Sequence, residues 1–210
     1  SGWILVGKKD QNQVPVFLWE DDDASFCEEA YSLENHARDL DSVLSDWMPQ
    51  LDLADIIQEV LKCFPSLHDI GKADPRFQDF LWGGYMESVS QPLRAKSEDQ
   101  QLTKEEFLQL WQECQLPAGW RHEFCSLDVL KDNPDLMGEL TDEGRELLRH
   151  LIGTHHGYGR ILAPMVEDKQ AQPFDFAPNG TQHTLKHRQP WYRLDSGWID
   201  QFAKIQHKHG

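Results

Sequence analysis

The stretch SLHDIGKADPRFQ, residues 66–78, contains an adjacent His68 and Asp69, followed by Gly71 and Lys72. A chain of this composition holds about one His-Asp pair by chance, so the pair carries weight only through its surroundings. Imidazole and carboxylate groups together suit transition metals, and a carboxylate can bridge two ions that imidazoles hold from either side. The stretch is therefore predicted to be the centre of a metal site.

The same stretch is predicted to form a turn between two helices. Apolar residues at helical spacing predict a helix over residues 53–64, and Pro65 is expected to end or kink it because proline has no amide hydrogen. Gly71 is expected to adopt a left-handed conformation after that helix. Asp74 followed by Pro75 resembles an N-cap with proline at the first helical position, which predicts a short helix.

Most of the remaining chain also has helical patterning. An apolar stripe beginning at Leu33 predicts an amphipathic helix with His36 on its apolar side. A core histidine is the commoner explanation for such a residue, and a metal ligand is the alternative. Further helices are predicted over residues 103–115, 121–131, 141–152 and 196–207, with a capping box at 103–106 and with Gly153 ending the helix at 141–152. Residues 83–102 are expected to form a loop, and proline and glycine dominate residues 153–190.

Two apolar segments near the start of the chain, residues 3–6 and 14–19, are rich in β-branched and aromatic residues and predict a β-hairpin. The acidic run at residues 20–23 is expected to be a solvated connection. The sequence therefore predicts an all-α domain over residues 31–210, with a small β-hairpin appendage and its connection over residues 1–30. A length of 210 residues suits one such domain.

The composition predicts a soluble protein with a packed core. Hydrophobic residues make up 39% of the chain, and no apolar run is long enough to span a membrane. The four cysteines show no CxxC spacing, which argues against a zinc ribbon or disulfide framework and favours a reducing cytosol. A formal net charge of −16 argues against a nucleic-acid binder that depends on charge. Residues 181–210 carry a charge of +3, for which a solvated surface is the expected explanation.

Several histidines outside the opening stretch are candidate ligands. They are His36, His122 in GWRHEFCSL, and the adjacent His155 and His156 in GTHHGYG. The adjacent pair is weak evidence alone, but a turn after a helix could direct both rings into one pocket. Together with His68 and Asp69, these residues give a two-metal site in outline.

The sequence resembles the HD nuclease domain of CRISPR-associated type I helicase-nucleases in the order of its motifs, which are a histidine, HDxGKAxPxFQ, RHExxSL and HHG. The resemblance covers residues 31–160, with weaker similarity in LDSGWIDQFAKIQ at residues 194–206. It implies an HD-domain helical bundle. The hairpin and acidic segment resemble the arrangement in which this domain follows a helicase in the chain.

The resemblance also implies two groups of ligands that share one carboxylate. They are His36, His68 and Asp69 for one divalent ion, and Asp69, His122, His155 and His156 for a second. The ions would be Mn, Ni, Fe, Co, Zn or Mg. Asp69 and Lys72 would be catalytic, with the Lys72 ammonium stabilising the phosphate, and a solvated lysine in a turn is the alternative.

The implied substrate is single-stranded DNA, fed by a helicase domain or subunit after an RNA-guided CRISPR complex has displaced the strand. The setting would be the prokaryotic cytoplasm, without a membrane partner. No GxxxxGK[ST] phosphate loop occurs, so no nucleotide cofactor is expected on this chain. The implied activity is thus hydrolysis of a phosphodiester by bound metal ions.

One part of the family pattern is missing from the sequence. The resemblance implies a further acidic ligand on a helix beyond the LDSGW-like segment, and Asp195 and Asp200 stand in the wrong context to replace it. The domain is therefore expected to lack its C-terminal helices. Two other functions stay open, an HD phosphohydrolase acting on nucleotides or phosphomonoesters, and a catalytically silent interaction domain whose histidines pack in the core and whose positive tail docks a partner.

Overall fold

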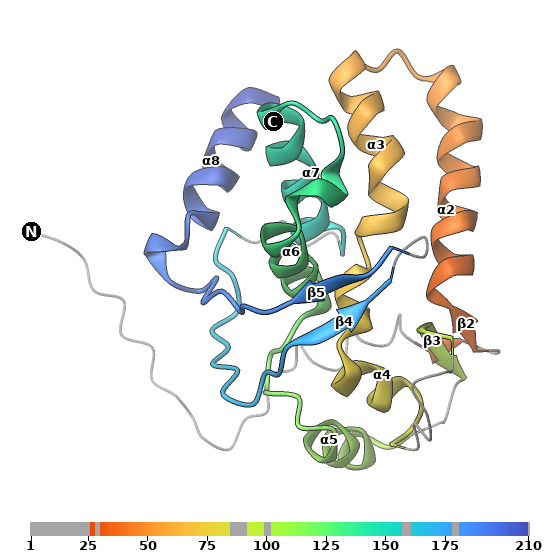
Figure 1. Ribbon diagram of the computed structural model, residues 1–210, viewed down its shortest axis with the longest axis vertical. Coiled ribbons are helices and arrows are strands. Elements are labelled where there is room, and N and C mark those ends of the chain that lie inside the picture. The colour runs from red at the N-terminus through yellow and green to blue at the C-terminus, as the bar shows by residue number, and fades with distance from the viewer. Residues whose placement is uncertain are drawn as a thin grey trace, which may run out of the picture.

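The computed structural model describes residues 26–27, 30–84, 92–98, 102–156, 161–177 and 181–209. Most of this part of the chain is helical, which confirms the prediction of a mainly helical domain (Figure 1). The hairpin predicted at residues 3–6 and 14–19 lies outside the described residues. No helix in the described ranges has the length and apolar character needed to cross a membrane.

The α-helices are α2 (Leu33–Trp47), α3 (Asp55–Leu67), α4 (Pro75–Leu81), α5 (Lys104–Glu113), α6 (His122–Asp132), α7 (Asp142–Thr154) and α8 (Trp198–His209). Short 3-10 helices lie at Met48–Gln50, Ile70–Ala73 (η3), Pro134–Met137 and Leu194–Ser196. Helices α2, α3, α7 and α8 follow one another in space, each packed against the next, and α6 packs on α7 and η3 (Figure 1). Every residue of α6 from His122 to Leu130 is buried, so this helix lies in the core.

Side-chain caps explain where several helices begin. The Asp74 side chain accepts a hydrogen bond from the Arg76 amide at the start of α4, and Pro75 takes the first helical position, as predicted. Thr103 and Glu106 form the predicted capping box of α5. These local signals hold because each depends only on residues within one turn.

Two helix ends differ from the prediction. Helix α3 continues through Pro65 to Leu67, so Pro65 does not end it. In the last turn a proline removes only one helical hydrogen bond, and the buried ring contributes to packing. Gly153 likewise lies inside α7, where a Cβ would come within 2.4 Å of the Trp198 ring. Its function is therefore to let α8 approach α7.

Two segments expected to be irregular contain short strands. Within residues 83–102, β3 (Arg94–Glu98) pairs in parallel with β1 (Phe26–Cys27) and antiparallel with β2 (Tyr31–Ser32), in the order β1-β3-β2. Within residues 153–190, β4 (Phe174–Phe176) and β5 (His183–Leu185) form an antiparallel pair. These strands have two to five residues, too few to show the alternating pattern by which strands are recognised.

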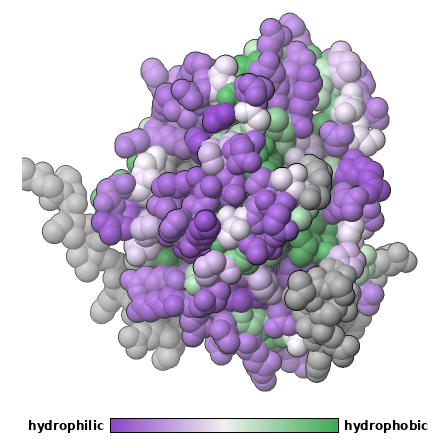
Figure 2. Space-filling model, in the orientation of Figure 1, coloured by the Kyte–Doolittle hydropathy of each residue, from purple (hydrophilic) through white to green (hydrophobic). Residues whose placement is uncertain are grey.

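Hydrophilic residues cover most of the face shown in Figure 2, and hydrophobic side chains are visible mainly between them. The end of α2 departs from this pattern, because Val43 and Trp47 from its apolar stripe are 43% and 60% exposed. The positive tail also differs from the expected solvated surface at Arg188, which donates hydrogen bonds to Cys125 and Asp74. The tail therefore contributes to the packed domain.

Candidate metal centre

Asp69 lies at the centre of the histidine cluster, in the turn between α3 and η3, and is only 4% exposed. Its Oδ2 atom lies 3.4 Å from His36 Nε2 and 3.5 Å from His68 Nε2. Its Oδ1 atom lies 3.1 Å from His122 Nε2 and 3.4 Å from His155 Nε2. Each carboxylate oxygen therefore faces its own set of imidazole nitrogens.

All six sequence-predicted ligands come together in the structure. They form two groups that share Asp69, namely His36, His68 and Asp69, and Asp69, His122, His155 and His156, with ligand atoms within 4.8 Å of one another in each group. The first group contains a close pair of ring nitrogens, His36 Nε2 and His68 Nε2, at 3.3 Å. In the second, His156 Nε2 lies 2.9 Å from His122 Nε2. The arrangement has the form of two cation sites with one common carboxylate.

Helix ends set the direction of two of these rings. His68 is the C-cap of α3, and its Nδ1 lies 3.0 Å from the Pro65 carbonyl oxygen. His155 is the C-cap of α7, and its Nδ1 lies 2.7 Å from the Ile152 carbonyl oxygen. A carbonyl oxygen can only accept, so Nδ1 carries the proton in both rings. The Nε2 lone pairs are left to face Asp69.

The cluster fits a metal ion by the atoms that it leaves unsatisfied. Asp69 Oδ1 and His155 Nε2 are buried and have no hydrogen-bond partner in the structure, although they face each other at 3.4 Å. Two lone pairs repel at this distance unless a proton or a metal cation lies between them, and the raised pKa of His155, caused by Asp69, shows that this position favours positive charge. The C-terminal ends of α3 and α7, which carry partial negative charge, also favour cations there. Imidazole and carboxylate donors suit first-row transition metals.

The protonation states of His68, His156 and Asp69 suit metal binding, whereas Asp69 raises the pKa of His155 against the effect of burial. Burial lowers the pKa of His68 to about 4 and that of His156 to about 3. Burial acts to raise the pKa of Asp69, but the Lys72 ammonium and nearby His68 hold it well below its usual range. The two imidazoles are neutral and the carboxylate is ionised near neutral pH, which are the forms that bind metal ions.

Lys72 is buried and lies beside Asp69, so the alternative of a solvated lysine in a turn is wrong. Its Nζ atom lies 2.9 Å from Asp69 Oδ2 and donates a hydrogen bond to the Ala95 carbonyl oxygen at 3.1 Å. Gln78 fixes the same region, because its side-chain amide donates to the carbonyls of Lys72 and Arg94. Strand β3, which the sequence did not predict, thus supplies part of the surroundings of the centre.

Gly71 and Ser126 join the two halves of the cluster. The prediction that Gly71 adopts a left-handed conformation is wrong. A Cβ on this residue would lie 2.1 Å from the His122 carbonyl oxygen and 2.5 Å from the Ser126 amide. The Gly71 amide donates to Ser126 Oγ at 2.8 Å, and Ser126 Oγ donates to the His68 carbonyl at 2.9 Å. Sequence reasoning missed the function of Ser126, although its position one helical turn after His122 was a usable signal.

The sequence resemblance implies a further acidic ligand beyond the LDSGW-like segment. Among the residues that the structure describes, Asp69 is the one acidic member of the two groups. Asp195 is exposed and pairs with Arg193 at 2.9 Å, and Asp200 is exposed on α8. This agrees with the expectation that neither residue takes that place.

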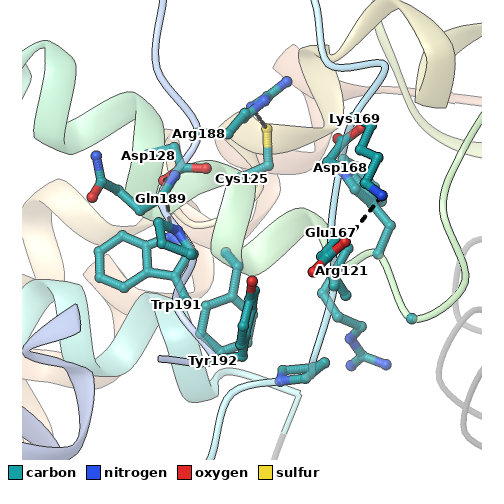
Figure 3. A pocket seen from close by; sticks show the side chains of 16 residues that line it. Arg121, Cys125, Asp128, Glu167, Asp168, Lys169, Arg188, Gln189, Trp191 and Tyr192 are labelled. Atoms are coloured by element: carbon teal, nitrogen blue, oxygen red, sulfur yellow. Dashed lines mark hydrogen bonds and ion pairs between the residues drawn. The ribbon is translucent and has the colours of Figure 1, made fainter. Parts of the chain in front are cut away.

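A separate cavity of about 300 Å³ lies between α6 and segments 164–169 and 188–192 (Figure 3). Arg188 donates hydrogen bonds there to Cys125 Sγ at 2.7 Å and to Asp74 Oδ2 at 2.6 Å. The Asp128 carboxyl accepts hydrogen bonds from the Trp191 indole at 2.8 Å and from the backbone amide of Gln189 at 3.1 Å. These contacts hold the C-terminal segment against α6, the helix that carries His122.

Asp128 predicts a pH dependence of stability. Burial raises its pKa to about 7, although the Gln189 amide, Arg188 and Trp191 oppose the rise. The pKa of an unfolded aspartate is about 3.9, so folding takes up a proton between these values. The contribution of Asp128 to the free energy of unfolding is therefore fully present below about pH 4 and is lost as the pH rises through 7.

Asp128→Asn is expected to remove this loss. Denaturant unfolding measures the free energy of unfolding of both proteins. Between pH 5.5 and pH 8 the variant should become more stable relative to the parent by about 1 to 2 kcal/mol. The amide of the variant is uncharged at both pH values, whereas Asp128 must ionise in a buried site. The exposed Asp200→Asn serves as the control, and a pH-independent difference for Asp128→Asn would contradict the assignment.

The comparison with protein-family models gives a match to Cas3, HD domain, over residues 19–207. Comparisons with curated proteins and with solved structures gave no significant match. The family match confirms the resemblance seen in the sequence motifs, and members of this family are CRISPR-associated HD proteins of a metal-dependent hydrolase superfamily. Since the matched residues include nearly the whole sequence, the chain belongs to the Cas3 HD-domain family.

Proposed function

We propose that this domain is a metal-dependent nuclease that hydrolyses phosphodiester bonds of single-stranded DNA in CRISPR-associated interference. The observation that carries the proposal is the position of Asp69, whose two oxygens face different sets of imidazole nitrogens. A shared carboxylate between two cations is typical of two-metal sites that act on phosphate esters. The family match supports the same class of chemistry.

The residues of the chain would act as follows. The first ion would be held by His36, His68 and Asp69, and the second by Asp69, His122, His155 and His156. When bound, such ions lower the pKa of coordinated water and neutralise negative charge on the phosphodiester. Asp69 keeps its ionised form because of Lys72, and the buried turn restricts water around the carboxylate. Manganese, nickel, iron, cobalt, zinc and magnesium are the candidate ions.

Lys72 has a position that supports a function in the site. The sequence prediction that it stabilises the phosphate remains a prediction. Its Nζ atom already has two protein partners, the Asp69 carboxylate and the Ala95 carbonyl oxygen. We infer that Lys72 also offsets the charge of Asp69 and orients Oδ2 toward His36 and His68.

The family and the charge of the chain support the proposed partners. A Cas3-type HD domain acts with a helicase, and we propose that the helicase and an RNA-guided complex deliver the displaced strand. The net charge of −16 gives the domain little attraction for DNA of its own. Delivery by partners removes the need for a strongly basic surface on this chain.

A side-by-side assay tests the proposal. Purified protein with manganese, nickel, iron or cobalt is expected to cleave single-stranded oligonucleotides. Cleavage should stop when a chelator is added and resume when the metal is restored. Nucleotides and a phosphomonoester are tested in parallel. Hydrolysis of these small substrates with intact DNA would favour the phosphohydrolase alternative, and the absence of both metal binding and hydrolysis would favour the interaction domain.

A further inference from the structure

Glu123 is a buried carboxylate to which the proposed mechanism assigns no function. It is 4% exposed and follows His122 in the first turn of α6. Its Oε1 atom accepts a hydrogen bond from Arg121 Nε at 2.8 Å. Its Oε2 atom is buried without a hydrogen-bond partner, which is costly for a carboxylate unless a donor is nearby.

One candidate donor is the second nitrogen of the His122 ring. His122 Nε2 faces Asp69 Oδ1 at 3.1 Å, and His122 Nδ1 lies 3.7 Å from Glu123 Oε2. That separation is longer than a hydrogen bond, so the two atoms would have to approach each other by about 0.5 Å for one to form. The ring thus lies between two carboxylates, one for each nitrogen.

The position of His122 in its helix explains why a carboxylate is needed there. His68 and His155 each follow a helix, so a carbonyl three residues earlier accepts the Nδ1 proton. His122 instead opens α6, where the backbone presents N–H groups, which cannot accept a proton. A side-chain acceptor must therefore replace the missing carbonyl.

Glu123 has the charge that this function requires. The Arg121 guanidinium is always charged, and its Nε atom lies 2.8 Å from Oε1, so it favours the ionised carboxylate. The N-terminus of α6 also stabilises a negative charge in its first turn. The group is therefore an anionic acceptor near neutral pH, held in place from its other oxygen.

We propose that Glu123 is a positioning residue for the metal centre, accepting a hydrogen bond from His122 Nδ1–H and so directing the Nε2 lone pair toward the ion beside Asp69 Oδ1. This inference rests on the proposed metal-dependent function. A carboxylate behind a ligating histidine fixes the ring and raises its basicity, and removing such a group typically weakens metal binding about 10- to 100-fold. The effect falls on the group with His122, His155 and His156, and spares the group with His36 and His68.

The test measures manganese affinity at the two sites by calorimetric titration of Glu123→Ala, Glu123→Gln and the parent. Glu123→Ala is expected to weaken one of the two binding events about 10- to 100-fold and leave the other unchanged. Glu123→Gln keeps an acceptor oxygen of similar size, so it should recover part of the loss. Glu113→Ala on the exposed face of α5 is the matched control, because the Glu113 side chain accepts its hydrogen bond from Gln109 of the same helix.

A spectroscopic measurement separates positioning from simple structural support. In zinc-loaded parent protein, nitrogen NMR of the His122 ring should show a proton on Nδ1 and a metal-bound Nε2, and Glu123→Gln should shift the Nδ1 proton resonance. The inference is overturned if both variants bind two ions with the affinities of the parent. It is also overturned if the variants unfold more easily in the presence of chelator while the ratio of the two metal affinities stays the same. A parent protein that binds no ion beside His122 would instead overturn the proposed function.

Discussion

Asp69→Asn is expected to abolish binding of both ions and to lower nuclease activity by at least about 10³-fold, or about 4 kcal/mol of activation free energy. The amide is neutral and nearly the same size, so the change removes the bridging charge with little change in packing. Metal content by elemental analysis and cleavage of single-stranded DNA are the measurements. The exposed Asp200→Asn should retain both, and a doubly loaded Asp69→Asn protein would contradict the bridging arrangement.

Loss of folding must be separated from loss of the metal in this experiment. Asp69→Asn leaves the buried Lys72 ammonium without its anion, which costs about 3 kcal/mol or more in a buried pair. The double variant Asp69→Asn with Lys72→Met removes both charges and should regain much of that stability. It should still bind no metal, whereas His36→Ala alone should reduce the metal content by one ion.

Gly71→Ala is expected to lower the free energy of unfolding by about 3 kcal/mol or more. The added Cβ meets backbone atoms of His122 and Ser126 at 2.1 and 2.5 Å, and a helix backbone cannot yield as a side-chain tip can. Helix α6 must therefore move away from η3, which separates His122 from Asp69 and also weakens metal binding. Urea unfolding in the presence of chelator measures the first effect without the second.

Gly144→Ala is the matched control for that experiment. Gly144 lies in the first turn of α7, and a Cβ there meets its nearest neighbours at ordinary contact distances of 3.4 to 3.5 Å. Alanine has the higher helix propensity, so this variant should be unchanged or more stable by up to about 1 kcal/mol. If Gly71→Ala lowers the free energy of unfolding by less than about 1 kcal/mol, the close approach of η3 to α6 contributes little to stability.

The predictable part of the fold was its local chemistry. The Asp74-Pro75 start and the Thr103 capping box are each encoded within one helical turn, and both are present. The histidine positions were informative for a different reason, since their order along the chain matched a family pattern. That pattern identified all the members of the two ligand groups that share Asp69.

The parts that the sequence did not predict depend on contacts between distant segments. Pro65 was expected to end or kink α3, but the helix continues beyond it to Leu67, and the His68 ring lies against the Pro65 carbonyl oxygen. Strand β3 is held by Gln78 and by short partners far away in the chain. Gly153 is explained by Trp198 on α8, which no local pattern reveals.

The two histidines that cap helix ends give the centre a further property. The last turns of α3 and α7 are where helices fray first, and the rings of His68 and His155 are fastened to the carbonyls of those turns. Two metal ions joined through Asp69 would tie the ends of both helices to each other and to α6. The metals would then act as a cross-link that closes long loops of the chain, so that losing them loosens the domain as well as stopping the chemistry.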